Sequence, residues 1–445
     1  MLPVVTPIEM KAIDAQAAES EEVLIQRAGY AVANSALRML GGSYGRRVNV
    51  IIGKGNNGQD GQVAARLLQR RGVRCKIYRP GPEILAEADL VIDAAYGTGF
   101  RDEWEPPPQP RCPVLAVDIP SGVDGLTGED HGSLQAERTI TFGALKPGLL
   151  LEPGASRAGQ LEIADLGLNV GSSRCNLITD HDLRMPLSQR TATDHKWTNA
   201  VRLIAASPGM IGAAQLAASG ALRAGAGMIV VSSPTTNLQA SDMPPEAVTR
   251  QLTNNDLVSE VLKDLDRFAA LLIGPGLGTD PDTIAATAEL IERSPIPTVV
   301  DADGLKAVAA HPSCLQRRVA ATVLTPHDGE FEKLTGSPPS ADRCAAVREA
   351  AKDSAVLLKG PTTLVSDVNG DLIFVRNANQ RLATAGTGDV LTGIIGAIIR
   401  NSPIHLAAAA AAHWHGQASQ LAQPHMTASD LPLLLDPARS AMLSK

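Results

Sequence analysis

The chain has 445 residues, of which 44% are hydrophobic and 3% aromatic, and 40 lysines and arginines against 47 aspartates and glutamates give a net charge of −7. This length predicts more than one domain, and the hydrophobic fraction excludes general disorder. The acidic balance and the scarcity of aromatic side chains exclude a dedicated nucleic-acid-binding protein. Because there is no signal-peptide pattern, no C-x-x-C pair and no apolar stretch near the ~20 residues of a membrane span, we expect a cytoplasmic protein that binds no membrane.

Short apolar segments alternate with helical spacing in the first half of the chain. We expect strands at 48–52, 76–78, 90–94, 114–117, 139–142 and 161–163, and a helix at 62–71. Continuous apolar strands between helices predict a parallel sheet that is covered on both faces. The pattern lapses between 171 and 199, which predicts a domain junction there and two domains at 1–175 and 190–445.

The second half begins a new α/β series. We expect strands at 203–206, 228–231, 271–273, 298–300, 321–324, 356–358 and 372–375, and helices at 212–224, 390–400 and 406–421. Residues 234–265 receive no role. The sequence thus predicts two α/β domains in tandem.

A glycine- and asparagine-rich segment, GKGNNGQDG at 53–61, follows the first strand and is predicted to be a loop before the helix. Glycines and a helix N-terminus present N–H groups that suit a phosphate, although a structural turn is the alternative. Two further segments, DAAYGTGF at 93–100 and DIPSGVD at 118–124, also end strands, so we expect all three at one sheet edge. Asn57, Asp93 and Ser121 offer oxygen ligands for a cation; alternatively, the aspartates cap helices.

Together with TFGALKPG at 141–148, these motifs resemble the NAD(P)H-hydrate epimerases. The resemblance implies a Rossmann-like three-layer αβα domain with a potassium ion on Asn57, Asp93 and Ser121. Gln59 stands where the family usually has glycine, and its side chain could crowd the phosphate loop. The residues implied to bind the hydrated dinucleotide are Asn56, Asn57, Gly58, Gln59, Asp60, Gly97, Thr98, Gly99, Phe100, Arg101, Asp102, Glu103 and Asp118.

Epimerisation breaks and remakes a bond at C6 of the hydrated nicotinamide ring, which calls for a positioned acid–base group. Asp118 is the first candidate. Lys146 is the second, either as a proton donor or as an electrostatic partner, and its alternative is a solvated surface lysine.

The segment ATAGTGDVLTG at 383–393 precedes an apolar helix. Two glycines that flank a threonine at a helix N-terminus predict a group of N–H donors for a phosphate. Asp389 follows in the first turn and could take a proton from an attacking hydroxyl, which is most of what phosphoryl transfer requires. The alternative for Asp389 is a helix cap.

This motif resembles the ribokinase-like fold, and its companions narrow the resemblance to the ADP-dependent NAD(P)H-hydrate dehydratases. The companions are SPGMIGAA at 207–214, GPGLG at 274–278, DAD at 301–303, TPHDGE at 325–330 and LKGPTT at 358–363. The resemblance implies a ribokinase-like αβα domain that uses Mg²⁺ with ADP or ATP. The implied hydrate contacts are Ala213, Gly276, His327 and Asp389, and the implied nucleotide contacts are Lys359, Gly360, Pro361, Thr362, Thr363 and Gly388.

We therefore expect a homo-oligomeric repair enzyme that epimerises the hydrates of NADH and NADPH (NADHX and NADPHX) and dehydrates the S form. In the expected mechanism Asp389 activates the C6 hydroxyl, which is phosphorylated and then leaves as phosphate. The alternatives are a small-molecule kinase that stops at the phosphoester, and a nucleotide-binding protein with one inactive domain. The second is favoured by Gln59 and by HKWTNA at 195–200, where the family usually has two glycines in a loop that could cover the site; Ala205 and Ala206 also replace usual glycines.

Overall fold

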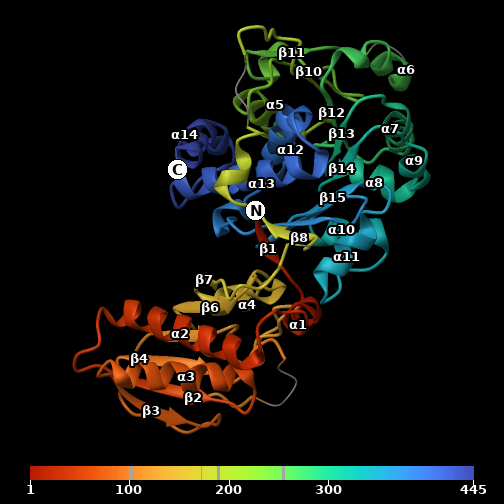
Figure 1. Ribbon diagram of the computed structural model, residues 1–445. Helices are drawn as coiled ribbons and strands as arrows, with labels where there is room; N and C mark the ends of the chain where they lie inside the picture. The colour runs from red at the N-terminus through yellow and green to blue at the C-terminus, as the bar shows by residue number, and fades with distance from the viewer. Residues whose placement is uncertain (100–103, 172, 188–190, 253–255, 445) are drawn as a thin grey trace. The chain divides into compact units, whose positions relative to one another are not determined.

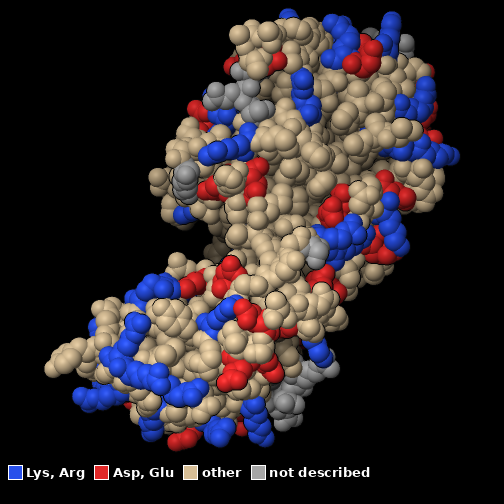
Figure 2. All heavy atoms as spheres, viewed as in Figure 1, with Lys and Arg blue, Asp and Glu red and all other residues tan. Residues whose placement is uncertain are grey.

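The computed structural model describes residues 1–99, 104–171, 173–187, 191–252 and 256–444, and it divides into two compact units between Cys175 and Asn176. Each unit is built around its own sheet (Figure 1). Acidic and basic side chains are interspersed on the viewed face of each unit (Figure 2). No helix among the described residues has the length and apolar character to span a bilayer.

The sheet of the first unit is parallel throughout and has the order β3-β2-β4-β5-β6-β7. Its strands are β2 (Arg47–Ile52), β3 (Arg74–Tyr78), β4 (Leu90–Ala94), β5 (Val114–Val117), β6 (Arg138–Phe142) and β7 (Gln160–Ala164). A short strand β1 (Leu2–Val4) precedes them, and Val4 bridges to Leu145. The helices are α1 (Pro7–Ala15), α2 (Glu21–Leu40), α3 (Asn56–Arg70) and α4 (Gly154–Ala158).

Alternate side chains of these strands enter two different cores. Val50 faces α2 and α3, which pack on one side of the sheet, whereas Ile51 faces a cluster around Trp104 on the other side. The third layer is therefore built largely of irregular chain. After β2 the chain turns to β3 on one side, and β4 lies on the other side of β2. Such a switch point opens a crevice at the carboxyl ends of β2 and β4, where ligands of open α/β sheets bind.

The sheet of the second unit has the order β8-β17-β16-β15-β14-β13-β12-β9-β10-β11. Its strands are β8 (Cys175–Leu177), β9 (Ala200–Ile204), β10 (Met228–Ser232), β11 (Ala247–Thr249), β12 (Ala270–Ile273), β13 (Thr298–Val300), β14 (Thr322–Leu324), β15 (Ala355–Leu358), β16 (Thr363–Ser366) and β17 (Leu372–Val375). From β11 to β15 neighbours are parallel, and β15, β16 and β17 are antiparallel. The switch point of this sheet lies between β9 and β12.

The helices of this unit are α5 (Ile211–Arg223), α6 (Leu257–Leu262), α7 (Pro281–Arg293), α8 (Asp303–Ala310), α9 (Ser313–Gln316), α10 (Asp328–Thr335), α11 (Arg343–Ala350), α12 (Thr387–Ile398), α13 (Ile404–Leu421) and α14 (Leu431–Leu443). Helices α5 and α12 pack in direct backbone contact. A Cβ on Gly220 would lie 2.5 Å from the Val390 carbonyl oxygen, and one on Gly393 would lie 2.1 Å from the Ala217 carbonyl oxygen. This close packing fixes the start of α12 over the sheet.

Most predicted elements are confirmed, including every strand of the first unit and the helices at 212–224 and 406–421. Several boundaries were wrong; the helix predicted at 390–400, for example, runs from Thr387 to Ile398. Helix α3 begins at Asn56, so the predicted loop at 56–61 forms the first turns of the helix. Strand β9 ends at Ile204 because Ala206 has a φ of +71°, outside the extended region. The unassigned residues 234–265 contain β11 and α6, both too short for a clear periodic pattern.

Ala302, between β13 and α8, has φ +48° and ψ −119°, a conformation that essentially only glycine adopts without strain. We expect Ala302→Gly to raise the free energy of unfolding by about 1 kcal/mol, because strain of about 1–3 kcal/mol is relieved and glycine's larger unfolded-state entropy offsets part of it. Urea unfolding in a Trp104→Phe background measures this, since Trp197 and Trp414 of the second unit then supply the fluorescence.

The matched control is Ala309→Gly inside α8, which we expect to lower the same free energy by up to about 1 kcal/mol. A loss of stability in Ala302→Gly equal to that of the control would show that the backbone at Ala302 is unstrained.

Candidate active sites

A pocket of ≈ 660 Å³ lies in the first unit at the carboxyl ends of β2, β4 and β5. The three glycine-rich segments do meet there. The Thr98 N–H donates to Asp118 Oδ2 over 3.4 Å, and a Cβ on Gly97 would lie 3.6 Å from the Asn57 side chain. The sequence-predicted residues that line the pocket are Asn56, Asn57, Asp60, Gly97, Thr98, Gly99, Asp118 and Lys146. Phe100, Arg101, Asp102 and Glu103 fall outside the described residues.

Glycines at the start of α3 permit backbone-to-backbone packing rather than a loose loop. A Cβ on Gly58 would lie 2.1 Å from the Gly53 carbonyl oxygen, and one on Gly53 would lie 1.8 Å from the Ala95 carbonyl oxygen. Neither position can take a side chain without moving main chain. Gln59 does not line the pocket: its exposed side chain donates to Asn56 Oδ1 over 3.3 Å. The crowding expected from Gln59 is therefore absent.

Asp118 and Lys146 form a buried ion pair at the pocket. Lys146 Nζ lies 2.6 Å from Asp118 Oδ1, and the lysine side chain is 1% exposed, which overturns the surface-lysine alternative. The same ammonium donates to Thr141 Oγ1 over 2.8 Å and to the Phe142 carbonyl over 3.1 Å. Asp118 itself has a φ of +66°, a strained conformation for a residue with a side chain. All three N–H bonds of Lys146 are thus committed within the protein.

Asp60 adds a second carboxyl to this pocket. Burial raises the pKa of Asp60 to about 8, and the negative charges of Asp118 and Asp14 add to that effect. At neutral pH Asp60 is therefore mostly protonated and can donate a hydrogen bond. The sequence motif predicted Asp60 as a contact. It could not predict that Asp60 is protonated, because its burial and its closeness to Asp14 depend on packing.

The three predicted cation ligands lie in buried positions beside this pocket. Asp93 is fully buried and accepts hydrogen bonds from Ser121 Oγ at 2.6 Å and from the Ser121 N–H at 2.9 Å. Burial raises the pKa of this carboxyl, and Ser121 opposes the shift. Both polar atoms of the buried Asn57 side chain lack a hydrogen-bond partner. A buried carboxylate and an unpartnered buried amide oxygen fit a bound monovalent cation.

In the second unit α12 begins at a glycine-rich turn at the sheet edge. Gly386 caps the helix with a φ of +90°, and a Cβ there would lie 2.4 Å from Leu216 Cδ1. Asp389, in the first turn, does not cap the helix, contrary to the alternative. Burial raises the pKa of Asp389 to about 7; nearby Asp301 raises it too, and Lys359 opposes them. Asp389 therefore exchanges protons readily at neutral pH.

Lys359 lies at this helix start, and Gly276 lies against Ala213 in the first turn of α5. A Cβ on Gly388 would lie 3.5 Å from Lys359 Nζ, and one on Gly276 would lie 3.1 Å from the Ala213 Cβ. Gly360 to Thr362 form the turn between β15 and β16, and Thr363 opens β16. Met210 belongs to the SPGMIGAA motif but was not predicted as a contact. Its carbonyl oxygen and Cβ lie 2.7 Å and 2.9 Å from the same Cβ position on Gly276.

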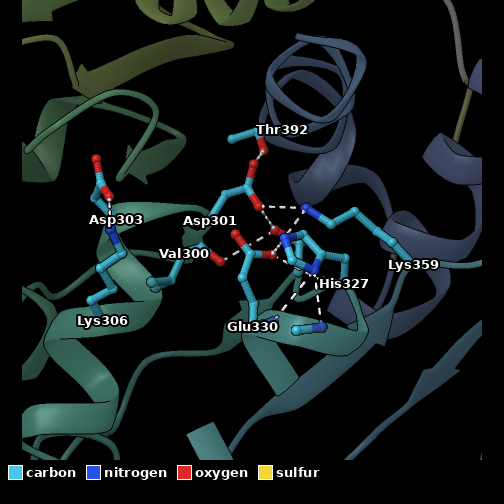
Figure 3. Close-up of polar contacts among 10 residues, drawn as sticks. Val300, Asp301, Asp303, Lys306, His327, Glu330, Lys359 and Thr392 are labelled. Carbon is cyan, nitrogen blue, oxygen red and sulfur yellow. Dashed lines mark hydrogen bonds and ion pairs between the residues drawn. The ribbon is translucent and has the colours of Figure 1, made fainter. Parts of the chain in front are cut away.

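His327 has a structural role as well as a place at the site. Its Nδ1 accepts the N–H bonds of Gly329 at 3.1 Å and Glu330 at 3.4 Å, so the histidine caps α10. Its ring is 60% exposed and lines a pocket of ≈ 240 Å³ with Lys306, Glu330 and others. The bonds of Asp301, Glu330 and Lys359 next to it are drawn in Figure 3.

The HKWTNA segment does not cover the site. It lies at the amino end of β9, whereas the glycine-rich turn lies at the carboxyl ends of the strands. Trp197 packs edge-on against Phe268 with ring centroids 5.6 Å apart, and Arg267 lies 4.0 Å above its ring. The tryptophan thus anchors the segment that leads into β9, and the expected interference with the site was wrong.

The fold and the two sites define a two-unit α/β protein, and comparisons agree. The second unit has the fold of a ribokinase-like protein from Enterococcus faecalis, with a TM-score of 0.52 and 19% identity over 60% of this chain and 96% of that one. A Bacillus subtilis structure described as an ADP/ATP-dependent NAD(P)H-hydrate dehydratase co-crystallised with ATP and Mg²⁺ matches with a TM-score of 0.50 and 28% identity, over 60% of this chain and 98% of that one.

The model of the NAD(P)H-hydrate dehydratase family matches residues 201–438, and that of the YjeF-related protein N-terminus matches 21–85 and 75–148. Bifunctional NAD(P)H-hydrate repair enzymes are similar over most of both chains. The one from Moorella thermoacetica is 35% identical over 96% of this chain and 94% of its own length, and the one from Mycobacterium leprae is 34% identical over 92% and 91%. The chain belongs to this family of bifunctional NAD(P)H-hydrate repair enzymes.

The packing at the start of α3 yields a local test. Alanine usually stabilises a helix relative to glycine by about 1 kcal/mol, but at Gly58 the added methyl meets main chain on a fixed strand end. We expect Gly58→Ala to lower local stability by about 2 kcal/mol through overpacking. Hydrogen exchange of residues 53–70, read by mass spectrometry, reports this. Gln59→Ala is the neighbouring control and should stay within about 0.5 kcal/mol; unchanged exchange in Gly58→Ala would contradict the packing.

Proposed function

We propose that this protein restores hydrated NADH and NADPH, first by interconverting the R and S hydrates at C6 and then by nucleotide-dependent dehydration of the S hydrate. One observation carries the proposal: each unit of this family member holds an acid–base residue under the influence of a lysine that follows a parallel strand. Lys146 lies 2.6 Å from Asp118 in the first unit, and the charge of Lys359 acts on Asp389 in the second. Two sites with separate chemistry suit two successive reactions on one damaged cofactor.

In the first unit Asp118 is the proposed acid–base residue of the epimerisation. Its Oδ1 is held by Lys146, while Oδ2 lies beside Gly97 and Thr98 at the pocket. Because Lys146 has three protein partners, its role is to hold and charge-stabilise Asp118 rather than to protonate the substrate. Protonated Asp60 can donate to the oxygen that departs from C6. The dinucleotide contacts proposed beside them are Asn56, Asn57, Gly97, Thr98 and Gly99, whereas Gly58 and Gln59 do not line the pocket.

In the second unit Asp389 is the proposed base. It takes the proton of the C6 hydroxyl, whose oxygen then attacks the terminal phosphoryl group of the nucleotide. The N–H groups of the α12 start, with Lys359, stabilise the charge on that group. The C6–O bond then breaks with phosphate as the leaving group, driven by the lone pair of the ring nitrogen. Loss of a proton from C5 to the departing phosphate restores the C5–C6 double bond.

Binding in the second unit is divided between two sets of residues. Ala213, Gly276 and His327 are the proposed hydrate contacts, and Lys359 to Thr363 with Gly388 are the proposed nucleotide contacts. Mg²⁺ would neutralise nucleotide phosphates. Among the described residues no group of three His, Cys, Asp or Glu side chains is placed to hold a metal, so the ion would arrive with ADP or ATP.

A hydrate assay with one variant in each unit tests the division of labour. With Mg²⁺ and ADP or ATP, the wild type should convert a mixed R/S hydrate of NADPH completely to NADPH. Asp118→Asn should stop at the S fraction, and Asp389→Asn should form no NADPH while R and S still equilibrate. Each should lose about a hundredfold or more of its own rate, since a positioned acid–base group contributes about 10²–10⁴. A stable phosphoester product would show a kinase instead.

Potassium is the proposed ion at Asn57, Asp93 and Ser121, where it would neutralise the buried carboxylate and engage the unpartnered amide. We expect epimerisation of the R hydrate, followed without nucleotide, to fall at least tenfold when choline replaces potassium at equal ionic strength. Asn57→Ala should be slow in both salts. Equal wild-type rates in potassium and choline would remove the ion from the proposal.

A further inference from the structure

Asp301 is a buried carboxylate, both oxygens of which accept hydrogen bonds, and the proposed reaction assigns it no role. It follows β13 directly and is 2% exposed. The main chain of Asp301 packs closely against Gly274, which follows β12: a Cβ on Gly274 would lie 1.8 Å from the Asp301 carbonyl oxygen. The residue is therefore held between two central strands at the edge where the site lies.

Three side chains from three different parts of the unit bond to this carboxylate, and two of them, Lys359 and Thr392, are labelled in Figure 3. Lys359, which follows β15, donates to Oδ1 over 2.9 Å. Thr325, which follows β14, donates to the same oxygen over 2.7 Å, and Thr392 of α12 donates to Oδ2 over 2.7 Å. Asp301 thus joins the lysine, the sheet and the helix whose first turn forms the anion site.

Stability alone is a weak explanation for this cluster. Taking a carboxylate and an ammonium out of water costs several kcal/mol per ion, and buried pairs are often no better for stability than apolar packing. Lys359 keeps 21% of its side chain exposed, contacts Glu330 at 3.6 Å, and lies 3.5 Å from the Cβ position of Gly388. Lys359 is therefore held at the start of α12 with part of its side chain exposed.

We propose that Asp301 is a positioning residue of the dehydratase site, which holds the Lys359 ammonium and the first turns of α12 in one arrangement around the transferred phosphoryl group. This rests on the proposed function of the second unit. A lysine has a flexible four-carbon stem, so an oriented partner is needed to fix its charge at one point. The hydrogen bond from Thr392 to Asp301 fixes α12 relative to Lys359, so that the helix N–H groups and the ammonium both point at the transferred phosphoryl group.

The charge of Asp301 also acts on the proposed base. Asp389 faces Asp301 and Asp303 beside β13, Glu330 on α10 and Lys359 after β15, with the buried His415 of α13 near the start of α12. Burial raises the pKa of Asp389, the carboxylates raise it further, and Lys359 lowers it. Removing the charge of Asp301 favours ionised Asp389. Because the base must be ionised to act, the acid limb of the rate profile then moves to lower pH.

Asp301→Asn tests the proposal, with the S hydrate of NADPH, Mg²⁺ and ADP or ATP as substrates. We expect KM for the nucleotide, and its Kd measured by calorimetry without hydrate, to rise by on the order of tenfold. We also expect the acid limb of kcat/KM to move to lower pH. The matched control is Asp264→Asn, which removes a 2.8 Å ion pair with Arg250 elsewhere in the unit and should change neither quantity.

Thr392→Val is the second variant, because it keeps shape and leaves the Asp301–Lys359 pair in place. It should raise the nucleotide KM several-fold and leave the acid limb where the wild type has it. The proposal would be overturned if Asp301→Asn bound the nucleotide as tightly as the wild type and kept the wild-type acid limb. If Asp301→Asn does not fold, a wild-type KM for the nucleotide in Thr392→Val would overturn it instead. Failure of the wild type to dehydrate the hydrate would instead overturn the proposed function, and nucleotide Kd would still test Asp301.

Discussion

A carboxylate paired with a lysine at the carboxyl ends of parallel strands is the interaction on which each unit depends. Asp118 and Lys146 form it in the first unit, and Asp301 and Lys359 form it in the second. Charges in such positions need partners on several sides, because a half-satisfied buried ion is costly. The surrounding threonines and main-chain carbonyls meet that need, so the sheet edge, the pair and the pocket must form together.

Backbone conformation at these edges follows from the same demand. The described non-glycine residues with positive φ are Asp118, Ala206 and Ala302, and each directly follows, or lies two residues after, a central strand. A strand that ends in an abrupt turn directs its next residues toward the crevice instead of over the sheet. Strain at these points is therefore a cost of aiming side chains at the switch point, and the packed cores of the two units supply the stability that sustains it.

The sequence predicted the strands well, because buried parallel strands such as Leu90–Ala94 are continuous apolar runs. It also identified the motifs that meet at each edge, since topology brings strand ends together. The sequence did not predict features that depend on tertiary packing. The first turns of α3 contain glycines typical of a loop, yet Gly58 is required by the Gly53 carbonyl. The bonds of Asp301 join residues 24, 58 and 91 positions away, and no local pattern contains them.

The cap that His327 places on α10 has a consequence for its tautomer. Nδ1 accepts two main-chain N–H bonds, so the proton of the neutral ring must lie on Nε2. Nε2 lies 3.5 Å from Glu330 Oε2, and on the exposed side of the ring it can offer a ligand only a donor. Helix geometry thereby selects acceptor groups, such as carbonyl or phosphate oxygens, as partners of this histidine.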